Sequence, residues 1–153
     1  MTRVVVLSGP NLGTLGEREP EIYGSATLAD IEVALRRRAE AAGVDLRVEQ
    51  SNHEGVLVDI LEQERHGADG CLINPGGLAH TSVVLADALR AFGHPVIEVH
   101  LSNIHAREPF RRVSLCAEAA TGVVTGLGPW GYVLGFDALV RILRGMSFDQ
   151  DHA

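Results

Sequence analysis

The sequence predicts an α/β fold in which a doubly wound sheet of five parallel strands lies between two layers of helices. Two observations predict it. Short apolar runs alternate with segments of helical periodicity along the chain, which is typical of a parallel sheet covered on both faces. The 153 residues are 46% hydrophobic and 22% charged, as in globular proteins. No linker or repeat interrupts the pattern, so residues 1–153 are expected to form one domain.

The first half of the chain shows both periodicities clearly. The run RVVVLSG at 3–9 is apolar enough for a buried strand. Helical spacing follows at Leu28, Ile31, Leu35 and Ala39. The stretch 44–52 alternates apolar and polar residues, as a strand does. The predicted elements here are a strand at 3–9, a helix at 27–43, a strand at 44–52 and a helix at 54–67, with Gly43 and Gly67 as helix stops.

The second half continues the alternation of strands and helices. ADGCLINPGG is a short apolar run that ends in a turn, and TSVVLADALRAFG has helical character with Gly93 at its end. The predicted elements are a strand at 68–77, a helix at 81–93, a strand at 94–103, a strand at 121–128 and a helix at 132–145. We expect a flavodoxin-like strand order for such a chain.

Composition excludes several classes of function. The net charge of -7 argues against a nucleic-acid-binding protein, which usually has a basic face. No apolar stretch approaches the ~20 residues of a membrane span, and the N-terminus lacks the pattern of a signal peptide. We therefore expect a cytoplasmic protein that binds neither nucleic acid nor membrane. Cys71 and Cys116 are expected to be buried free thiols.

Neither a metal nor an organic cofactor is predicted. The seven histidines are scattered, and no H-E-x-x-H or paired-cysteine pattern occurs. The segment 126–131, GLGPWG, fits G-x-G-x-x-G and follows a strand. No later strand supplies the acidic residue that would bind a ribose, so this segment is interpreted as a tight turn before the last helix.

Polar and glycine-rich residues follow every predicted strand. They form SGPN (8–11), QSNHEG (50–55), NPGGLAH (74–80), EVHLSN (98–103) and TGLG (125–128). Ligands of doubly wound sheets bind beyond the carboxyl ends of the strands. The chemical groups are therefore expected to meet at one edge of the sheet.

Two of these segments, together with the residues that follow them, contain candidate site residues. Glu98 and His100 are two residues apart on a strand and so share a face, where the carboxylate can orient a general acid; a purely structural pair explains them equally well. His80 and Asp87 are seven apart and would share a helical face, although helix capping explains the former. Arginines at 107, 111 and 112 offer a bidentate clamp for a carboxylate, or a solvated surface.

The segment 9–24, GPNLGTLGEREPEIYG, is unusually rich in glycine for a connection that also carries Arg18 and Tyr23. Its glycines permit hinging, so residues 13–24 are expected to form a lid over the site. A guanidinium beside a phenol favours the ionised phenol, which would make Tyr23 a general base. A flexible loop whose Tyr23 only covers the core is the alternative.

Taken together, GPNLGTLGEREPEIYG, QSNHEG, NPGGLAHTS and EVHLSNIHAREPFR resemble the signature blocks of the type II 3-dehydroquinate dehydratase family, in the family's order and over residues 4 to about 143. The resemblance implies a flavodoxin-like enzyme of the shikimate pathway that converts 3-dehydroquinate to 3-dehydroshikimate and water. It also implies a dodecamer of four trimers and no cofactor or metal. The alternative is a flavodoxin-like ligand-binding module without catalysis.

The resemblance also assigns roles. Tyr23 would be the base, supported by Arg18, and His100 the acid, with Glu98 behind it. Asn11 would help to stabilise the enolate. The substrate-binding residues would be Asn74, His80, Asp87, Leu101, Ser102 and Arg111, with Asp87 reaching a neighbouring subunit's site. Arg107 would be a further possible partner of Tyr23. Gly77 and Ala79 depart from the family's common pattern without removing any of these groups.

Overall fold

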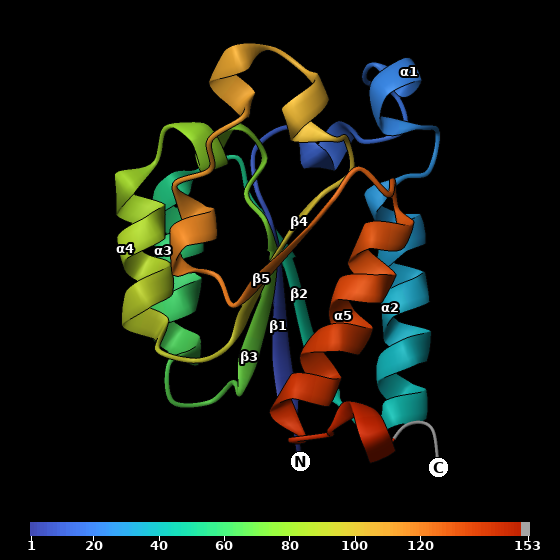
Figure 1. Cartoon of the computed structure of the whole chain (residues 1–153), viewed down its shortest axis with the longest axis vertical. Coiled ribbons are helices and arrows are strands. Elements are labelled where there is room, and N and C mark those ends of the chain that lie inside the picture. The colour runs from blue at the N-terminus through green and yellow to red at the C-terminus, as the bar shows by residue number, and fades with distance from the viewer. Residues whose placement is uncertain (151–153) are drawn as a thin grey trace.

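The computed structural model, which describes residues 1–150, contains a sheet of five parallel strands in the order β2-β1-β3-β4-β5 (Figure 1). This order is the flavodoxin-like one, so the predicted fold class is confirmed. The pairing between β1 and β3 runs from Val4 opposite Gly70 to Ser8 opposite Asn74. The strands are β1 (Arg3–Ser8), β2 (Asp45–Gln50), β3 (Gly70–Asn74), β4 (Val96–His100) and β5 (Gly122–Thr125).

Two pairs of long helices cover the two faces of the sheet. Helices α2 (Leu28–Ala42) and α5 (Trp130–Leu143) lie on one face, and α3 (Glu54–Glu64) and α4 (Val83–Phe92) lie on the other (Figure 1). The core divides accordingly, because successive side chains of a strand point to opposite faces. Val4 and Val6 of β1 join the core beneath α2 and α5, whereas Val5 and Leu7 join the core beneath α3 and α4.

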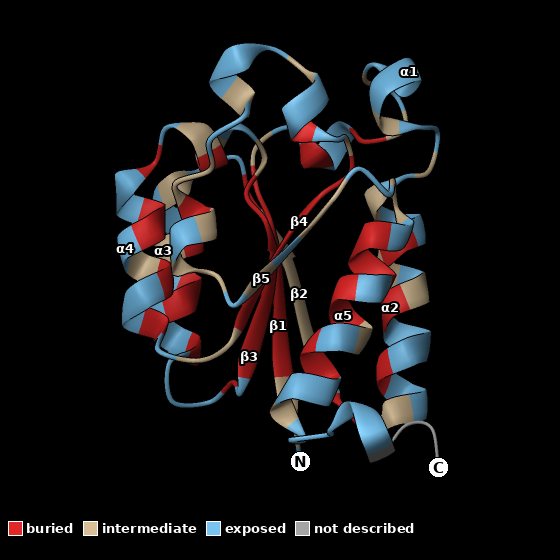
Figure 2. Ribbon diagram, in the orientation of Figure 1, coloured by how far each residue is buried: buried red, intermediate tan, exposed pale blue. Residues whose placement is uncertain are grey.

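The interior of the sheet is closed to solvent. Figure 2 shows β1, β3 and β4 as buried, while β2 is only partly buried. The two cysteines, Cys71 and Cys116, are buried and free, as predicted. Burial raises the pKa of both thiols, and that of Cys116 reaches about 12. None of the helices described in residues 1–150 has the length and apolar character needed to cross a membrane.

The predicted helix stops are correct at two of three positions. Gly43 and Gly93 follow α2 and α4 in the left-handed conformation that glycine favours. The prediction at Gly67 is wrong, because α3 ends at Glu64. Beyond it the chain continues in turns, in which the carbonyl of Glu64 accepts from the amides of Gly67 and Ala68.

Long connections leave the carboxyl ends of the strands. Between β1 and α2 lies a segment with a 3₁₀ turn at Leu12–Thr14 and the short helix α1 (Pro20–Tyr23). Between β4 and β5 lie three further 3₁₀ turns, at Ile104–Ala106, Pro109–Arg111 and Cys116–Ala119. In Figure 1, α1 and the first two of these turns lie at the end of the sheet opposite the N-terminus.

Candidate active site

A cavity of about 120 Å³ lies beyond the carboxyl ends of β1, β3 and β4. All of the predicted site residues line it except Glu98 and Asp87. Its walls are formed by Pro10, Asn11, Leu12, Arg18, Tyr23, Asn74, Gly76, Gly77, His80, His100, Leu101, Ser102, Ile104, Arg107 and Arg111. The structure therefore brings together side chains from the lid, from the turn after β3 and from the segment after β4.

Two turns that carry cavity residues approach each other closely. The amide of Gly9 donates to the carbonyl of Asn74 at 2.8 Å. A β-carbon at Gly9 would lie 2.5 Å from the carbonyl oxygen of Pro75, which is too close for any other residue. Glycine at this position therefore lets the segment after β1 pack directly on the NPGG turn after β3.

Tyr23 sits between two arginines. The Arg107 Nη1 group donates to the Tyr23 hydroxyl at 3.0 Å and to the Ser102 hydroxyl at 3.1 Å. The guanidinium carbon of Arg18 lies over the phenol ring, 5.1 Å from its centroid, and that of Arg107 lies at 5.3 Å, both within the range of a cation–π contact. Arg107, which the resemblance only suggested, is thus the residue that donates directly to the phenolic oxygen.

Residues 13–24, the expected lid, contain a short helix beside the cavity. Pro20 occupies the first turn of α1, a position that proline favours, and Tyr23 is the last residue of that helix. The ring packs against the core beneath α2 and α5 and also lines the cavity. The role of Tyr23 as a base stays a prediction.

His100 and Glu98 form a buried pair. The His100 Nε2 atom lies 3.0 Å from Glu98 Oε2, and Glu98 is 0% exposed. Since a carboxylate accepts, Nε2 carries the hydrogen in this bond, which leaves Nδ1 as the other nitrogen of the ring. The sequence prediction that these two side chains share a face is confirmed.

His80 lies beside His100, with ring centroids 6.2 Å apart. Its Nδ1 donates to the carbonyl of Val113 at 2.8 Å, so Nε2 is its free acceptor. The prediction that His80 and Asp87 share a helix is wrong. Gly76–His80 forms its own 3₁₀ turn, and α4 begins only after Ser82, whose hydroxyl accepts from the amide of Leu85 and caps the helix.

Asn11 adopts a left-handed backbone conformation with φ 69°. Its amide donates to Asn52 Oδ1 at 3.0 Å, and the same oxygen accepts from Gln50 Nε2 at 3.1 Å. Gln50 also donates to the carbonyl of Gly9. The block QSNHEG, whose role the residues alone did not reveal, thus holds the backbone of a cavity residue.

The side chain of Asn74 is hydrogen-bonded to Gly76 and to Tyr132. The amide of Gly76 donates to Asn74 Oδ1 at 3.1 Å. The hydroxyl of Tyr132 lies 2.9 Å from that of Ser8 and is fully buried. Burial raises the pKa of Tyr132 to about 12, although hydrogen bonds with Ser8 and with Asn74 lower it in part. Sequence reasoning missed Ser8 and Tyr132 because single buried hydroxyls carry no recognisable spacing.

Of Arg111 and Asp87, only Arg111 lines the cavity. Arg111 lines the cavity while its Nε pairs with Glu108 Oε2 at 2.9 Å. A hydrogen bond from its own backbone, followed by that from Arg111, lowers the pKa of Glu108. Asp87 does not reach the cavity of its own chain. It is largely exposed and lines a separate groove of about 510 Å³ between α3 and α4.

The arrangement supports acid–base chemistry on a small anion. A phenol beside a guanidinium and an imidazole beside a carboxylate face one cavity, together with amide, hydroxyl and arginine groups. Within residues 1–150, no group of three or more histidine, cysteine, aspartate or glutamate side chains is placed to hold a metal ion.

Comparison with known proteins agrees with this geometry. The model of the family described as dehydroquinase class II matches residues 2–140. The chain belongs to this family. A 3-dehydroquinate dehydratase of Gemmatimonas aurantiaca is 56% identical over 139 residues, which cover 91% of each chain. Another, from a Chelativorans species, is 53% identical over 92% of this chain and 97% of its own length.

A solved structure gives the same result for the fold. The type II dehydroquinase from Propionibacterium acnes is 39% identical, with a TM-score of 0.88 over 92% of this chain and 97% of its own. Family membership therefore favours the enzyme over a ligand-binding module without catalysis, and the resemblance stated from the sequence blocks is confirmed.

Proposed function

We propose that this cavity removes water from 3-dehydroquinate to give 3-dehydroshikimate, with Tyr23 as the base and His100 as the acid. Membership of the class II dehydroquinase family supplies the reaction, a step of the shikimate pathway. One observation of geometry supports the roles. Tyr23 and His100 line the same cavity, and each is hydrogen-bonded to a charged side chain, Tyr23 to Arg107 and His100 to Glu98.

The first step takes a proton from the carbon beside the ketone. The Arg107 hydrogen bond stabilises a negative charge on the Tyr23 oxygen, and Arg18 adds positive charge over the ring. Loss of the carbon-bound proton to Tyr23 leaves an enolate, whose charge needs donors. Asn11, fixed by Asn52, is the residue we assign to that task, in company with a bound water.

The second step expels the hydroxyl. His100 gives a proton from Nδ1 to the leaving oxygen, the bond from carbon to that oxygen breaks, and water forms. Glu98, bonded to Nε2, stabilises the imidazolium that precedes the transfer and holds the ring in place. No cofactor is required, because the reaction moves only protons and a hydroxyl group.

The remaining cavity residues bind the substrate. Arg111 offers a guanidinium to the carboxylate, and its present pairing with exposed Glu108 can be exchanged for the substrate. The side chains of Asn74, His80 and Ser102, together with the segment at Leu101, lie at the wall where the ring hydroxyls would be held.

We also propose a homododecamer of four trimers, in which Asp87 completes the site of a neighbouring subunit. The position of Asp87 supports this idea, since it is exposed and lies outside its own cavity. Analytical ultracentrifugation tests the assembly directly. A mass near that of one chain, 16.4 kDa, would contradict it.

The test of the reaction follows the ultraviolet absorbance of the enone product after 3-dehydroquinate is added to purified protein treated with a chelator. We expect turnover, and its absence at every pH from about 6 to 9 would overturn the proposal. The variant Tyr23→Phe keeps the ring against the core but lacks the base, so kcat should fall by about a hundredfold or more with an unchanged circular dichroism spectrum. A fully active variant would remove the base assignment.

A further inference from the structure

Glu98 uses both of its carboxylate oxygens. Oε2 accepts from His100, and Oε1 accepts from the hydroxyl of Ser114 at 2.9 Å. Glu98 is 0% exposed, and a buried carboxylate is costly unless its oxygens are hydrogen-bonded. Ser114 therefore supplies one of the two described contacts on which this buried group depends.

Ser114 is itself fixed in orientation. Its oxygen accepts from the amide of Ala117 at 3.1 Å, at the start of the 3₁₀ turn Cys116–Ala119. A serine hydroxyl has a single proton to donate, and here that proton is directed to Glu98. The backbone of the segment between β4 and β5 thus fixes the direction of the Ser114 hydroxyl.

The two contacts together hold the plane of the carboxylate. The last torsion of a glutamate side chain has broad preferences, so a carboxylate bound through one oxygen can rotate. Rotation of Glu98 would turn the ring of His100, whose Nε2 is bonded to it. Side chains that orient a catalytic imidazole in this way commonly change rates without touching the substrate.

We propose that Ser114 is a positioning residue for this reaction, which holds Glu98 so that His100 presents Nδ1 to the leaving hydroxyl. The inference rests on the proposed function and extends it by one residue. Ser114 does not line the active-site cavity, so its effect is transmitted through Glu98 alone. Ser114 lies sixteen positions from Glu98 in the chain, and no short spacing in the sequence links the two residues.

A second cavity makes this role testable without loss of the fold. It has a volume of about 340 Å³ and is lined by the polar residues Glu98, Ser114, His105, Arg112 and Thr125 and by the apolar residues Ile104, Ala117 and Val123. When the Ser114 hydroxyl is removed, water that enters beside these polar groups can bond the freed carboxylate oxygen. We therefore expect Ser114→Ala to fold, with a carboxylate that is solvated but less firmly oriented.

The experiment compares steady-state kinetics of the wild type, Ser114→Ala and Ser114→Thr. We expect kcat to fall on the order of tenfold in Ser114→Ala, with KM within about twofold because substrate contacts are intact. Ser114→Thr keeps the hydroxyl, and its extra methyl group can point into the second cavity, so it should recover most of the activity. An unchanged kcat in Ser114→Ala would overturn the proposal.

The matched control is Ser82→Ala. Like Ser114, Ser82 accepts from the backbone amide three residues further on and donates to a carboxylate, that of Glu54, but it does not line the active-site cavity. We expect Ser82→Ala to lower thermal stability while leaving kcat nearly unchanged. If Ser82→Ala slows turnover as much as Ser114→Ala does, the loss in Ser114→Ala reflects general destabilisation and the proposal is wrong.

Two further measurements separate positioning from general damage. In a Glu98→Ala background, Ser114 has nothing to position, so adding Ser114→Ala should leave kcat unchanged, and multiplied losses would refute the idea.

Nitrogen-15 spectra of His100 need no turnover, and its ring signals should shift or broaden in Ser114→Ala; identical spectra would also refute the proposal. A wild type inactive on 3-dehydroquinate would instead defeat the proposed function, with the spectral result still interpretable.

Discussion

Tyr23 contacts two arginines. Both guanidinium groups lie over the phenol ring, with the guanidinium carbon 5.1 Å from the ring centroid for Arg18 and 5.3 Å for Arg107. Of the two, only Arg107 donates a hydrogen bond to the phenolic oxygen, where negative charge would develop, and it bonds the Ser102 hydroxyl as well. The sequence indicated both cations but not this difference, since it depends on how α1 and the segment after β4 meet in the fold.

Arg107→Met tests the hydrogen bond to Tyr23. Methionine is similar in reach but neutral, so a phenolate would lose a charge-assisted donor, and kcat should fall by about tenfold or more. Steady-state assays measure the change. Arg37→Met, which alters an exposed arginine of α2, serves as the control and should keep its activity. Equal activity in both variants would show that Arg107 contributes nothing to the base.

At the scale of elements, the two ends of the lid lie against each other, with Gly16 packed on residues 25–27. We call this contact the neck. Gly16 has φ 95°, and a β-carbon there would lie 2.9 Å from the carbonyl oxygen of Ser25 and 3.1 Å from the Thr27 methyl group. Thr27 caps α2 through reciprocal bonds with Asp30. The neck is therefore tied directly to the start of a long helix, which sets where α1 and Tyr23 lie.

Gly16→Ala should disturb this neck, and Gly43→Ala, at the far end of α2, provides a control. Both glycines have positive φ, which disfavours alanine by roughly 1–2 kcal/mol in the left-handed region. Only Gly16 would also clash, since nothing lies within 4 Å of a β-carbon at Gly43. We expect Gly16→Ala to lower kcat/KM by about tenfold more than Gly43→Ala, and to speed proteolysis within residues 17–24. Similar losses in the two variants would contradict the packed neck.

The sequence predicted the elements of the sheet well because periodicity is a local property. Strand alternation and helical spacing located every long element, and Gly43 and Gly93 marked real helix ends. The prediction failed at Gly67, because α3 already ends at Glu64. The side chain of Glu64 accepts a hydrogen bond from Arg3 of β1, a contact that the local sequence does not indicate. The helix at α1 was not predicted, since four residues are too few for a periodic pattern.

Site residues that directly follow a strand were predicted from the sequence. Residues that support them through hydrogen bonds from outside the cavity were not. Fold logic gathers residues after β1, β3 and β4, and these line the cavity. Asn52, Tyr132 and Ser114 were given no role, because their hydrogen-bond partners are distant in the chain and no short sequence pattern indicates such pairs. Asp87 lies outside the cavity of its own chain.

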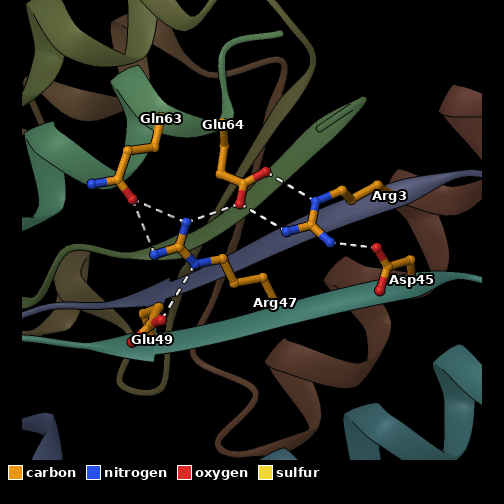
Figure 3. A network of polar contacts seen from close by, with 6 residues as sticks. All are labelled: Arg3, Asp45, Arg47, Glu49, Gln63 and Glu64. Carbon is orange, nitrogen blue, oxygen red and sulfur yellow. Dashed lines mark hydrogen bonds and ion pairs between the residues drawn. The ribbon is translucent and has the colours of Figure 1, made fainter. Parts of the chain in front are cut away.

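At the scale of the whole molecule, a charge network joins three elements on the other side of the fold from Tyr23. Figure 3 shows Glu64 of α3 between Arg3 of β1 and Arg47 of β2, at 2.8 and 2.9 Å. Arg3 also pairs with Asp45. Glu64 is nearly buried, and hydrogen bonds from Arg3 and then Arg47 lower its pKa from 4.5 to about 2. The network therefore ties an outer helix to two strands through one carboxylate.

The stability of the fold should depend on pH through Glu64. Its folded pKa lies below the unfolded value, so its contribution is fully present above pH 4.5 and is lost as pH falls toward about 2. The shift corresponds to at most about 3 kcal/mol of unfolding free energy. Glu64→Gln cannot ionise, so it should be less stable than the wild type at pH 7, and the difference should shrink between about pH 5 and 3.

Urea unfolding of both proteins at pH 7, 5 and 3 measures this difference. Glu32→Gln is the control, because Glu32 forms an exposed pair with Arg36 within one helix, and such pairs contribute only about 0.3–0.5 kcal/mol. Carboxylates outside the network titrate alike in all three proteins and cancel in the comparison, whereas Asp45 and Glu49, which pair with the same arginines as Glu64, contribute to the difference. A gap between wild type and Glu64→Gln that stays constant with pH would mean that the variant is destabilised by lost packing, and that the ionised carboxylate does not hold α3 to the sheet.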